Sequence, residues 1–147
     1  MNNRPDWSDY FLSVAKTVAL RGDCRRRKVG ALIVVENRIL STGYNGTSPK
    51  GEGCLEGKCP RGNKSFEEVP SYSSYEDCIA IHAETNAING MLLFNHFLRN
   101  DNGASNLTRL LREATIVVSE VPCSDCKEMI SGWGIPKTLS PEGVSEL

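Results

Sequence analysis

Two apolar runs that lie only two residues apart constrain the fold of this chain most strongly. VGALIVV spans residues 29–35 and RILSTGY spans residues 38–44, with Glu36 and Asn37 between them. β-Branched and apolar residues in runs of this length favour strands. A two-residue connection joins antiparallel neighbours in a tight hairpin. The chain must therefore contain an antiparallel pair of strands against which the remaining elements pack.

Residues 7–21 predict an amphipathic helix in front of this hairpin. Their apolar side chains recur at three- and four-residue spacing, and Gly22 follows as an end signal. The apolar positions are Phe11, Val14, Ala15, Val18 and Ala19. Such a helix can cover one face of the predicted strands.

Helical and strand patterns continue to alternate downstream. The predicted elements, in chain order, are a helix from Ser73 or Ser74 through residues 79–98 with an interruption at Gly90, a short helix at 107–113, a strand at 114–121, a helix whose first turn holds Pro122, and a short strand around Lys137–Ser140. Alternation of this kind predicts an α/β fold, a three-layer α/β/α sandwich with a mixed sheet. One domain over residues 1–147 accounts for the whole chain.

A segment of different composition interrupts this alternation at about residues 45–78. Its first part is rich in Gly, Pro and charged residues and carries Cys54 and Cys59. A structureless segment of this length inside a domain normally needs a function or a covalent or metal staple. The two cysteines indicate a staple.

Composition narrows the function classes. The net charge is −1, so no broad basic field is available to hold a nucleic-acid backbone, and nucleic acid is an unlikely partner. We find no apolar stretch that resembles a signal peptide or could cross a membrane, so we expect a cytoplasmic location. In that compartment six cysteines favour metal ligands or buried thiols over the alternative of a secreted disulfide scaffold.

Two short motifs form the candidate site. HAETNAI (82–88) holds His82 and Glu84, and PCSDC (122–126) holds Cys123 and Cys126, three residues apart. Two cysteines at this spacing near a helix start lie on one face, where the positive end of the helix favours thiolates. One histidine completes a three-ligand zinc set and leaves the fourth position open for water, as catalytic zinc requires.

Glu84 gives this set a catalytic purpose. Zinc lowers the pKa of a bound water to about 7, and a nearby carboxylate can carry its proton. Taken alone, PCSDC could also be a redox dithiol, a structural zinc knuckle or two buried thiols. The combination of His-x-Glu with Pro-Cys-x-x-Cys favours the catalytic interpretation, because it is the signature of zinc deaminases.

The same residues resemble the zinc-dependent cytidine and deoxycytidylate deaminase family. The resemblance extends through VGALIV, STGYNG (41–46) and Cys54, and it covers about residues 7–140. The GYNG element and the cysteine-bearing insert resemble the deoxycytidylate (dCMP) deaminase branch more than the nucleoside deaminases. The resemblance implies a cytidine-deaminase-like α/β/α sandwich.

The resemblance also implies roles for individual residues. His82, Cys123 and Cys126 hold the zinc. Glu84 takes a proton from water, protonates N3 of the base and then transfers a proton to the departing amine. The backbone of Ala83 would contact the base carbonyl, and Asn45 would contact the sugar or phosphate end.

Four cysteines and a basic run stay outside this centre. Some members of this branch carry a second, structural zinc, with ligands at positions that match Cys24 and Cys54. Because Cys59 and Cys78 are also present, we expect a closed four-cysteine site; the alternative is four small buried side chains. The run Arg25–Lys28 suits either phosphate recognition, with Arg26 and Arg27 as candidates, or an ordinary solvated surface.

We therefore expect a zinc-dependent hydrolase that converts dCMP to dUMP and ammonia, with a pyrimidine nucleotide as its ligand. Homo-oligomers and regulation by dCTP or dTTP are implied by the resemblance. Two alternatives stay open: a deaminase of another cytosine nucleoside, nucleotide or modified pyrimidine, and a zinc-binding module without catalysis. His96 is expected to have no chemical role, and Phe94 and Trp133 are expected in the core.

Overall fold

The fold was analysed in a computed structural model that describes residues 3–47, 51–65, 67–69, 78–93 and 106–147. Its elements, in chain order, are α1 (Trp7–Ala19), β1 (Gly30–Val35), β2 (Arg38–Tyr44), the 3-10 turn η1 (Cys54–Glu56), α2 (Ala83–Leu93), α3 (Leu107–Glu113), β3 (Thr115–Val118), α4 (Ser124–Gly132), β4 (Lys137–Ser140) and β5 (Gly143–Glu146). This order confirms the predicted alternation of helices and strands.

The five described strands form one mixed sheet in the order β2-β1-β3-β4-β5. β1 pairs antiparallel with both β2 and β3, whereas β3 pairs parallel with β4. The predicted hairpin is confirmed: Val35 faces Arg38, and Glu36 and Asn37 adopt φ values of 50° and 59°. Two successive positive φ values match a type I′ turn, whose twist suits the flanking strands.

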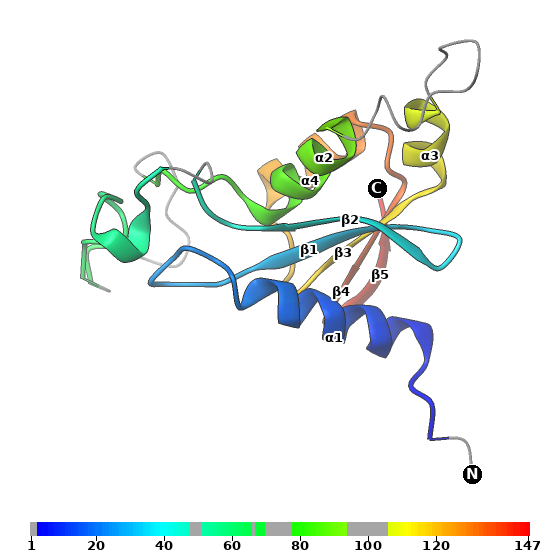
Figure 1. Cartoon of the computed structure of the whole chain (residues 1–147), viewed down its shortest axis with the longest axis horizontal. Coiled ribbons are helices and arrows are strands. Elements are labelled where there is room, and N and C mark those ends of the chain that lie inside the picture. Colours follow the sequence, from blue (N-terminus) through cyan, green and yellow to red (C-terminus); the bar gives the residue numbers. More distant parts are fainter. Residues whose placement is uncertain (1–2, 48–50, 66, 70–77, 94–105) are drawn as a thin grey trace.

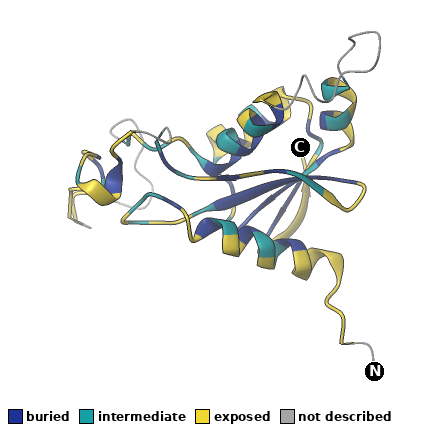
Figure 2. Ribbon diagram, viewed as in Figure 1, coloured by how far each residue is buried: buried dark blue, intermediate teal, exposed yellow. Residues whose placement is uncertain are grey.

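Helices cover both faces of the sheet, as the α/β/α prediction requires (Figure 1). α1 lies on one face, and α2, α3 and α4 lie on the other. Along β1, Leu32 and Val34 belong to the core on the α1 side, whereas Ala31, Ile33 and Val35 belong to the core on the opposite side. All of β1 is therefore buried, which explains why it lacks polar alternation (Figure 2).

The insert leaves and rejoins the sheet at one point. Gly46 and Ile81 pair as an isolated antiparallel bridge, with N···O distances of 3.0 and 2.9 Å. Further out, the carboxylate of Asp23 accepts the Leu55 N–H at 2.8 Å and ties η1 to the end of α1. The two ends of the insert are thus hydrogen-bonded to each other, and η1 within it is hydrogen-bonded to the loop after α1.

Several predictions at element ends are wrong. Residues 78–82 are not helical, because the bridge at Ile81 holds them extended and α2 begins only at Ala83. Pro122 precedes α4 rather than lying in its first turn, since Cys123 is the N-cap. The side chain of Trp133 is 42% exposed just after α4, so it does not belong to the core. The parts of the predicted second helix at 73–77 and 94–98, with Phe94 and His96, lie outside the described residues.

The strand β5 was not predicted. All four of its residues are exposed, so no hydrophobic alternation marks it in the sequence. It pairs antiparallel with β4 and includes Gly143, whose φ is 107°. In the part of the chain that the structure describes, no helix combines the length and apolar character needed to cross a bilayer.

Candidate metal centre and substrate pocket

The predicted ligands meet because two helices begin side by side at one edge of the sheet. The His82 carbonyl accepts the Asn86 N–H at 3.1 Å, so His82 immediately precedes the first turn of α2. Cys123 has the same relation to α4 and accepts the Lys127 N–H at 3.0 Å. Cys126 follows in the first turn of α4. Each ligand therefore lies at the positive end of a helix, which stabilises a thiolate.

A glycine in β2 allows α2 to approach closely enough to place His82. A Cβ atom at Gly43 would clash with the backbone of Ala83 and Ala87. On the same strand, the Ser41 hydroxyl donates to the Ala87 carbonyl at 2.6 Å. The glycine in STGYNG is therefore needed to fix the helix that follows His82.

The three ligand atoms have the spacing that zinc requires. His82 Nδ1 lies 3.0 Å from Cys126 Sγ and 3.9 Å from Cys123 Sγ. The three ligand atoms all lie within 4.8 Å of one another. Tetrahedral zinc with bonds of about 2.0–2.1 Å to nitrogen and about 2.3 Å to sulfur separates these atoms by roughly 3.6 Å. The two measured distances fall on either side of that value, so the residues present fit zinc.

Glu84 lies beside these ligands and is buried, with 4% of its surface exposed. Burial and the charge of Glu84 raise the pKa of the Cys126 thiol. Without a cation, a buried carboxylate beside two thiols is electrostatically unfavourable. A divalent cation would relieve this cost.

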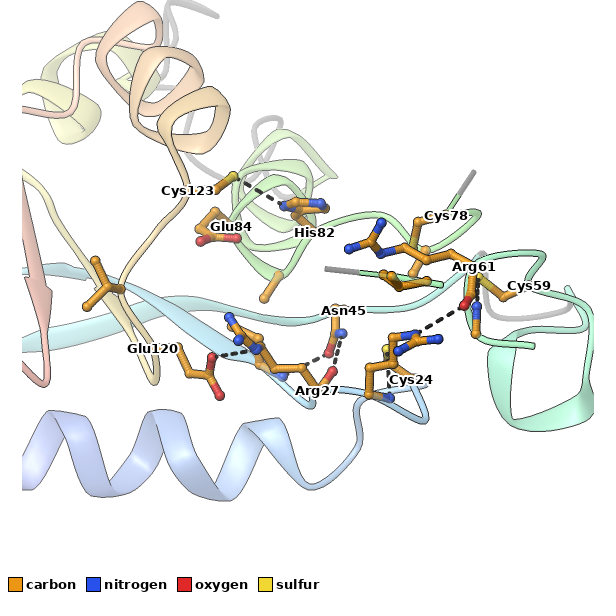
Figure 3. A pocket seen from close by; sticks show the side chains of 17 residues that line it. Cys24, Arg27, Asn45, Cys59, Arg61, Cys78, His82, Glu84, Glu120 and Cys123 are labelled. Carbon is orange, nitrogen blue, oxygen red and sulfur yellow. Dashed lines mark hydrogen bonds and ion pairs between the residues drawn. The ribbon is translucent and has the colours of Figure 1, made fainter. Parts of the chain in front are cut away.

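The centre opens into a cavity of about 410 Å³, large enough for a nucleotide-sized ligand (Figure 3). His82, Glu84 and Cys123 line one end of this pocket. Ala83 and Asn45, two of the predicted binding residues, also line it. Cys126 is buried behind them. The structure thus brings the predicted catalytic and binding residues to one pocket.

Asn45 already bonds to the neighbouring loop. Its Oδ1 accepts the Val29 N–H at 2.9 Å, and its Nδ2 donates to the Arg27 carbonyl at 2.8 Å. Asn45 therefore shapes the pocket wall through the backbone of residues 27–29.

The arginines of the basic run have different partners. Arg27 Nε forms an ion pair with Glu120 at 3.0 Å, next to the pocket. Arg26 points its guanidinium to the insert, where Nε donates to the Arg61 carbonyl at 3.1 Å and Nη2 donates to the Lys64 carbonyl. Both line the pocket, but protein groups bind both side chains.

Sequence reasoning missed Arg61 and Glu120 as pocket residues. Arg61 is 7% exposed and comes from the insert, whereas Glu120 follows β3 by two residues. Glu120 lies near a strand end that leads to PCSDC, which is a signal that could have identified it. No sequence signal identifies Arg61, because the sequence of an irregular segment has no periodicity from which the direction of a side chain could be predicted.

The remaining cysteines gather at the insert as two pairs. Cys24 lies close enough to Cys54, and Cys59 close enough to Cys78, to shift the pKa of its neighbour. Three of these sulfurs also accept backbone N–H groups at 3.3–3.4 Å, from Arg25 to Cys54, from Arg26 to Cys24 and from Gly62 to Cys59. Such donors are typical of cysteines that act as thiolates.

The two members of one pair differ in acidity. Although burial acts to raise it, the backbone N–H groups of Ile79, Gly62 and Arg61 lower the pKa of Cys59. Burial, together with neighbouring Cys59, raises the pKa of Cys78 to about 11. Among the described residues, only His82, Cys123 and Cys126 form a set of three or more metal-binding side chains with all ligand atoms within 4.8 Å. The four-cysteine cluster is therefore looser than the first centre.

Comparisons with known proteins match this site and fold. A family model described as the cytidine and deoxycytidylate deaminase zinc-binding region matches residues 5–140. The deoxycytidylate deaminase of Mycobacterium phage D29 is 38% identical over 95% of this chain and 98% of that protein. The deoxycytidylate deaminase of Schizosaccharomyces pombe is 31% identical over 92% of this chain, which spans only 37% of the yeast protein.

A solved structure shares the fold at lower identity. The dCMP deaminase of cyanophage S-TIM5, in complex with dCMP and dUMP, has a TM-score of 0.63 and 22% identity. The match covers 95% of this chain and 83% of the cyanophage chain.

Proposed function

This chain belongs to the cytidine and deoxycytidylate deaminase family, and from that membership we propose that it hydrolyses dCMP to dUMP and ammonia. The observation that carries the proposal is the convergence of His82, Cys123 and Cys126 beside buried Glu84 in one cavity. A relative of nearly the same span, at 38% identity, is a deoxycytidylate deaminase, which supports dCMP as the substrate.

His82, Cys123 and Cys126 would hold a zinc ion. When bound, the ion would act as a Lewis acid that lowers the pKa of water, so that hydroxide is available near neutral pH. The carboxylate of Glu84 holds the proton that the attacking water releases and delivers it to N3 of the cytosine ring. Water oxygen adds to C4, and Glu84 then takes the remaining proton of the added hydroxyl and transfers it to the amine. The C4–N4 bond breaks as the C4 carbonyl forms, and the amine leaves as ammonia. A buried carboxylate suits both transfers, because its protonated form carries no charge to be solvated.

Two pocket residues would orient the base and sugar. Ala83 is the first residue of α2, where backbone N–H groups have no partner within the helix and can donate to the base carbonyl. Asn45 would contact the sugar or phosphate end while its amide holds residues 27–29. Both roles are part of the proposal.

The four insert cysteines would form a second, structural zinc site. Their pairing and their N–H donors support this assignment. A metal would draw the two pairs together and fasten the insert to the loop after α1. Metal analysis of the purified protein tests it, since about two zinc ions per chain are expected and about one would contradict the second site.

Assembly, regulation and location complete the proposal. Homo-oligomers are supported by large side chains exposed on the single chain, such as Trp7, Leu93 and Trp133, and light scattering would measure the oligomer size. Control by dCTP or dTTP would appear as a changed rate when either triphosphate is added to the assay. A cytoplasmic location would be tested by cell fractionation.

The decisive experiment offers dCMP, CMP, deoxycytidine and cytosine separately to the purified protein and measures ammonia release. We expect the highest kcat/KM with dCMP. Preference for another cytosine compound would keep the deaminase chemistry and replace the substrate. No release from any of them would favour the non-catalytic zinc module.

A further inference from the structure

An ion pair between two distant segments lies in the wall of the substrate pocket. Arg27 Nε is 3.0 Å from a carboxylate oxygen of Glu120, and both residues line the cavity that also contains Glu84. Figure 3 shows Arg27 between Glu120 and Asn45, below Glu84 in this view. The pair therefore joins the segment that leads into β1 to the segment that leads from β3 to α4, at the pocket itself.

Arg27 is held at its backbone as well as at its side chain. Asn45 Nδ2 donates to the Arg27 carbonyl at 2.8 Å, and Asn45 Oδ1 accepts the Val29 N–H at 2.9 Å. Contacts at the carbonyl and at Nε together restrict the directions that this side chain can take. A group held in this way binds a ligand more tightly, because less conformational freedom is lost on binding.

The contact with Glu120 leaves part of the Arg27 guanidinium for a ligand. A guanidinium has two edges with paired N–H groups, one formed by Nε with an Nη group and one formed by both Nη groups. A carboxylate at Nε lies on the first edge. Within the part of the chain that the structure describes, Glu120 is the one ion-pair or hydrogen-bond partner of this guanidinium. The second edge can therefore bind two oxygens of a phosphate group.

The neighbouring arginine of the basic run is directed to the insert. Arg26 Nε donates to the Arg61 carbonyl at 3.1 Å, and Arg26 Nη2 donates to two further carbonyls, those of residues 64 and 65. The two arginines thus contact different segments. Of the two phosphate candidates in the run, Arg27 is the one whose side chain is fixed beside the segment that leads to the zinc ligands of α4.

We propose that Glu120 makes the pocket selective for nucleotides over nucleosides by holding Arg27 in place, so that the second edge of the Arg27 guanidinium binds the 5′-phosphate. Arg27 would contact the substrate, and Glu120 would act through Arg27 as a positioning residue. This inference rests on the proposed function, since it concerns how the same substrate is recognised. A charge effect alone predicts the opposite sign, because a carboxylate beside the pocket repels a phosphate and its removal would tighten binding.

The first test compares Glu120→Gln with the wild type in steady-state kinetics with dCMP and with deoxycytidine. If Glu120 positions Arg27, KM for dCMP should rise about three- to tenfold. The value of kcat and the zinc content should stay near those of the wild type, because Glu84 and the zinc ligands are untouched. The value of kcat/KM for deoxycytidine, which lacks the phosphate, should not change. A KM for dCMP that falls or stays the same would overturn the positioning role.

Glu113→Gln is the matched control. Glu113 forms an ion pair with Arg109 on α3 at 3.5 Å, and its side chain is 43% exposed, close to the 39% of Glu120. Neither member of this pair lines the cavity. Glu113→Gln removes the same charge and breaks the same kind of contact, so its KM for dCMP should equal that of the wild type. An equal rise in both Gln variants would overturn a specific role for Glu120.

Arg27→Gln tests the phosphate contact itself. Loss of a charge-assisted contact should raise KM for dCMP about 10- to 100-fold, while kcat/KM for deoxycytidine stays unchanged. Arg109→Gln is its control, because the two arginine side chains are 59% and 60% exposed and each pairs with one glutamate. An unchanged KM in Arg27→Gln would overturn the proposal.

A double variant shows whether Glu120 acts through Arg27. Glu120→Gln added to Arg27→Gln should cause no further rise in KM for dCMP. Rises that multiply would show that Glu120 acts independently and would overturn its positioning role.

Both single variants should fold, because exposed ion pairs contribute little to folding stability. If either Gln variant does not fold, Arg27→Lys and Glu120→Asp decide. The ammonium has no second edge, and the shorter carboxylate cannot hold Nε in the same place, so KM for dCMP should rise in both. A wild-type KM in either would overturn the proposal.

These outcomes are separable from failure of the proposed function. A wild-type protein that releases no ammonia from dCMP contradicts the proposed function before any variant is made. A wild-type protein that prefers dCMP, with an unchanged KM in Glu120→Gln and Arg27→Gln, contradicts only the inference about this ion pair.

Discussion

The protein has two cysteine clusters, and they differ in what holds them together. Cys123 and Cys126 lie at the start of α4 beside His82, where two helices packed on a buried sheet position their side chains. Cys24, Cys54, Cys59 and Cys78 lie on the insert and the loops beside it, where backbone N–H groups donate to the sulfurs of Cys24, Cys54 and Cys59. The helices and the sheet position the side chains of the first cluster, whereas, among the described elements, no packed helix or strand positions those of the second cluster. A metal is therefore expected to add chemistry at the first and stability at the second.

The largest expected effect is at the first cluster. Cys123→Ala removes one of three ligands, so this centre should lose its metal and deaminase activity should fall below detection. The sheet core is untouched, so the far-ultraviolet circular dichroism spectrum should match that of the wild type. Metal analysis should show a loss of about one zinc ion per chain, and full metal content would remove Cys123 from the ligand set.

Glu84→Gln separates metal binding from proton transfer at the same cluster. The amide has nearly the same size but cannot take a proton, so kcat should fall by about 10²–10⁴-fold, the range of general acid–base contributions. Zinc content should stay at the wild-type level. An active Glu84→Gln protein would contradict the role assigned to this carboxylate.

Cys59→Ala tests the second cluster. It removes one of the four proposed ligands and the sulfur that accepts the Gly62 N–H, so the insert should loosen and the protein should lose about one zinc ion per chain. Thermal unfolding should occur at lower temperature, by more than the roughly 2–4 °C that corresponds to 1 kcal/mol in a chain of this size.

The kinetic signature of Cys59→Ala should differ from that of the first cluster. KM for dCMP should rise because residues of the insert line the pocket, while kcat falls much less than in Glu84→Gln. Loss of kcat with an unchanged KM would mean that the two clusters are not separate in function.

The smallest effect is expected at the contact between the insert and the end of α1. Asp23→Ala removes the acceptor of the Leu55 N–H and should lower the free energy of unfolding by about 1 kcal/mol. Zinc content and kcat should not change. Urea unfolding measures the difference, and a loss of several kcal/mol would show that Asp23 holds more of the insert than this hydrogen bond.

The comparison also shows which parts of the site were predictable. His82, Glu84, Cys123 and Cys126 were identified because their spacing and residue types have a joint chemical reason. The hairpin at Glu36 and Asn37 was predictable because a two-residue turn allows one pairing. Local pattern was sufficient in both cases, since the constraint lies within a few residues.

The start of α2 and the exposure of Trp133 were not predictable from local pattern. Residues 78–82 continue an apolar helical pattern, but pairing of Ile81 with distant Gly46 holds them extended. Trp133 follows α4 at a position that the sheet does not reach. Long-range pairing decided one case, and the packing geometry of the layers decided the other.

The sequence alone indicated the chemistry proposed for this protein, namely its metal ligands and its proton carrier, together with its alternation of helices and strands and its family resemblance. The tertiary structure alone decided where the insert's side chains point. Arg61 and Arg26 both line the pocket, and the guanidinium of Arg26 also donates to the Arg61 carbonyl of the insert. The physical reason is that ligand chemistry is a property of residue types at short spacing, whereas side-chain direction in an irregular segment depends on backbone contacts between residues far apart in the chain.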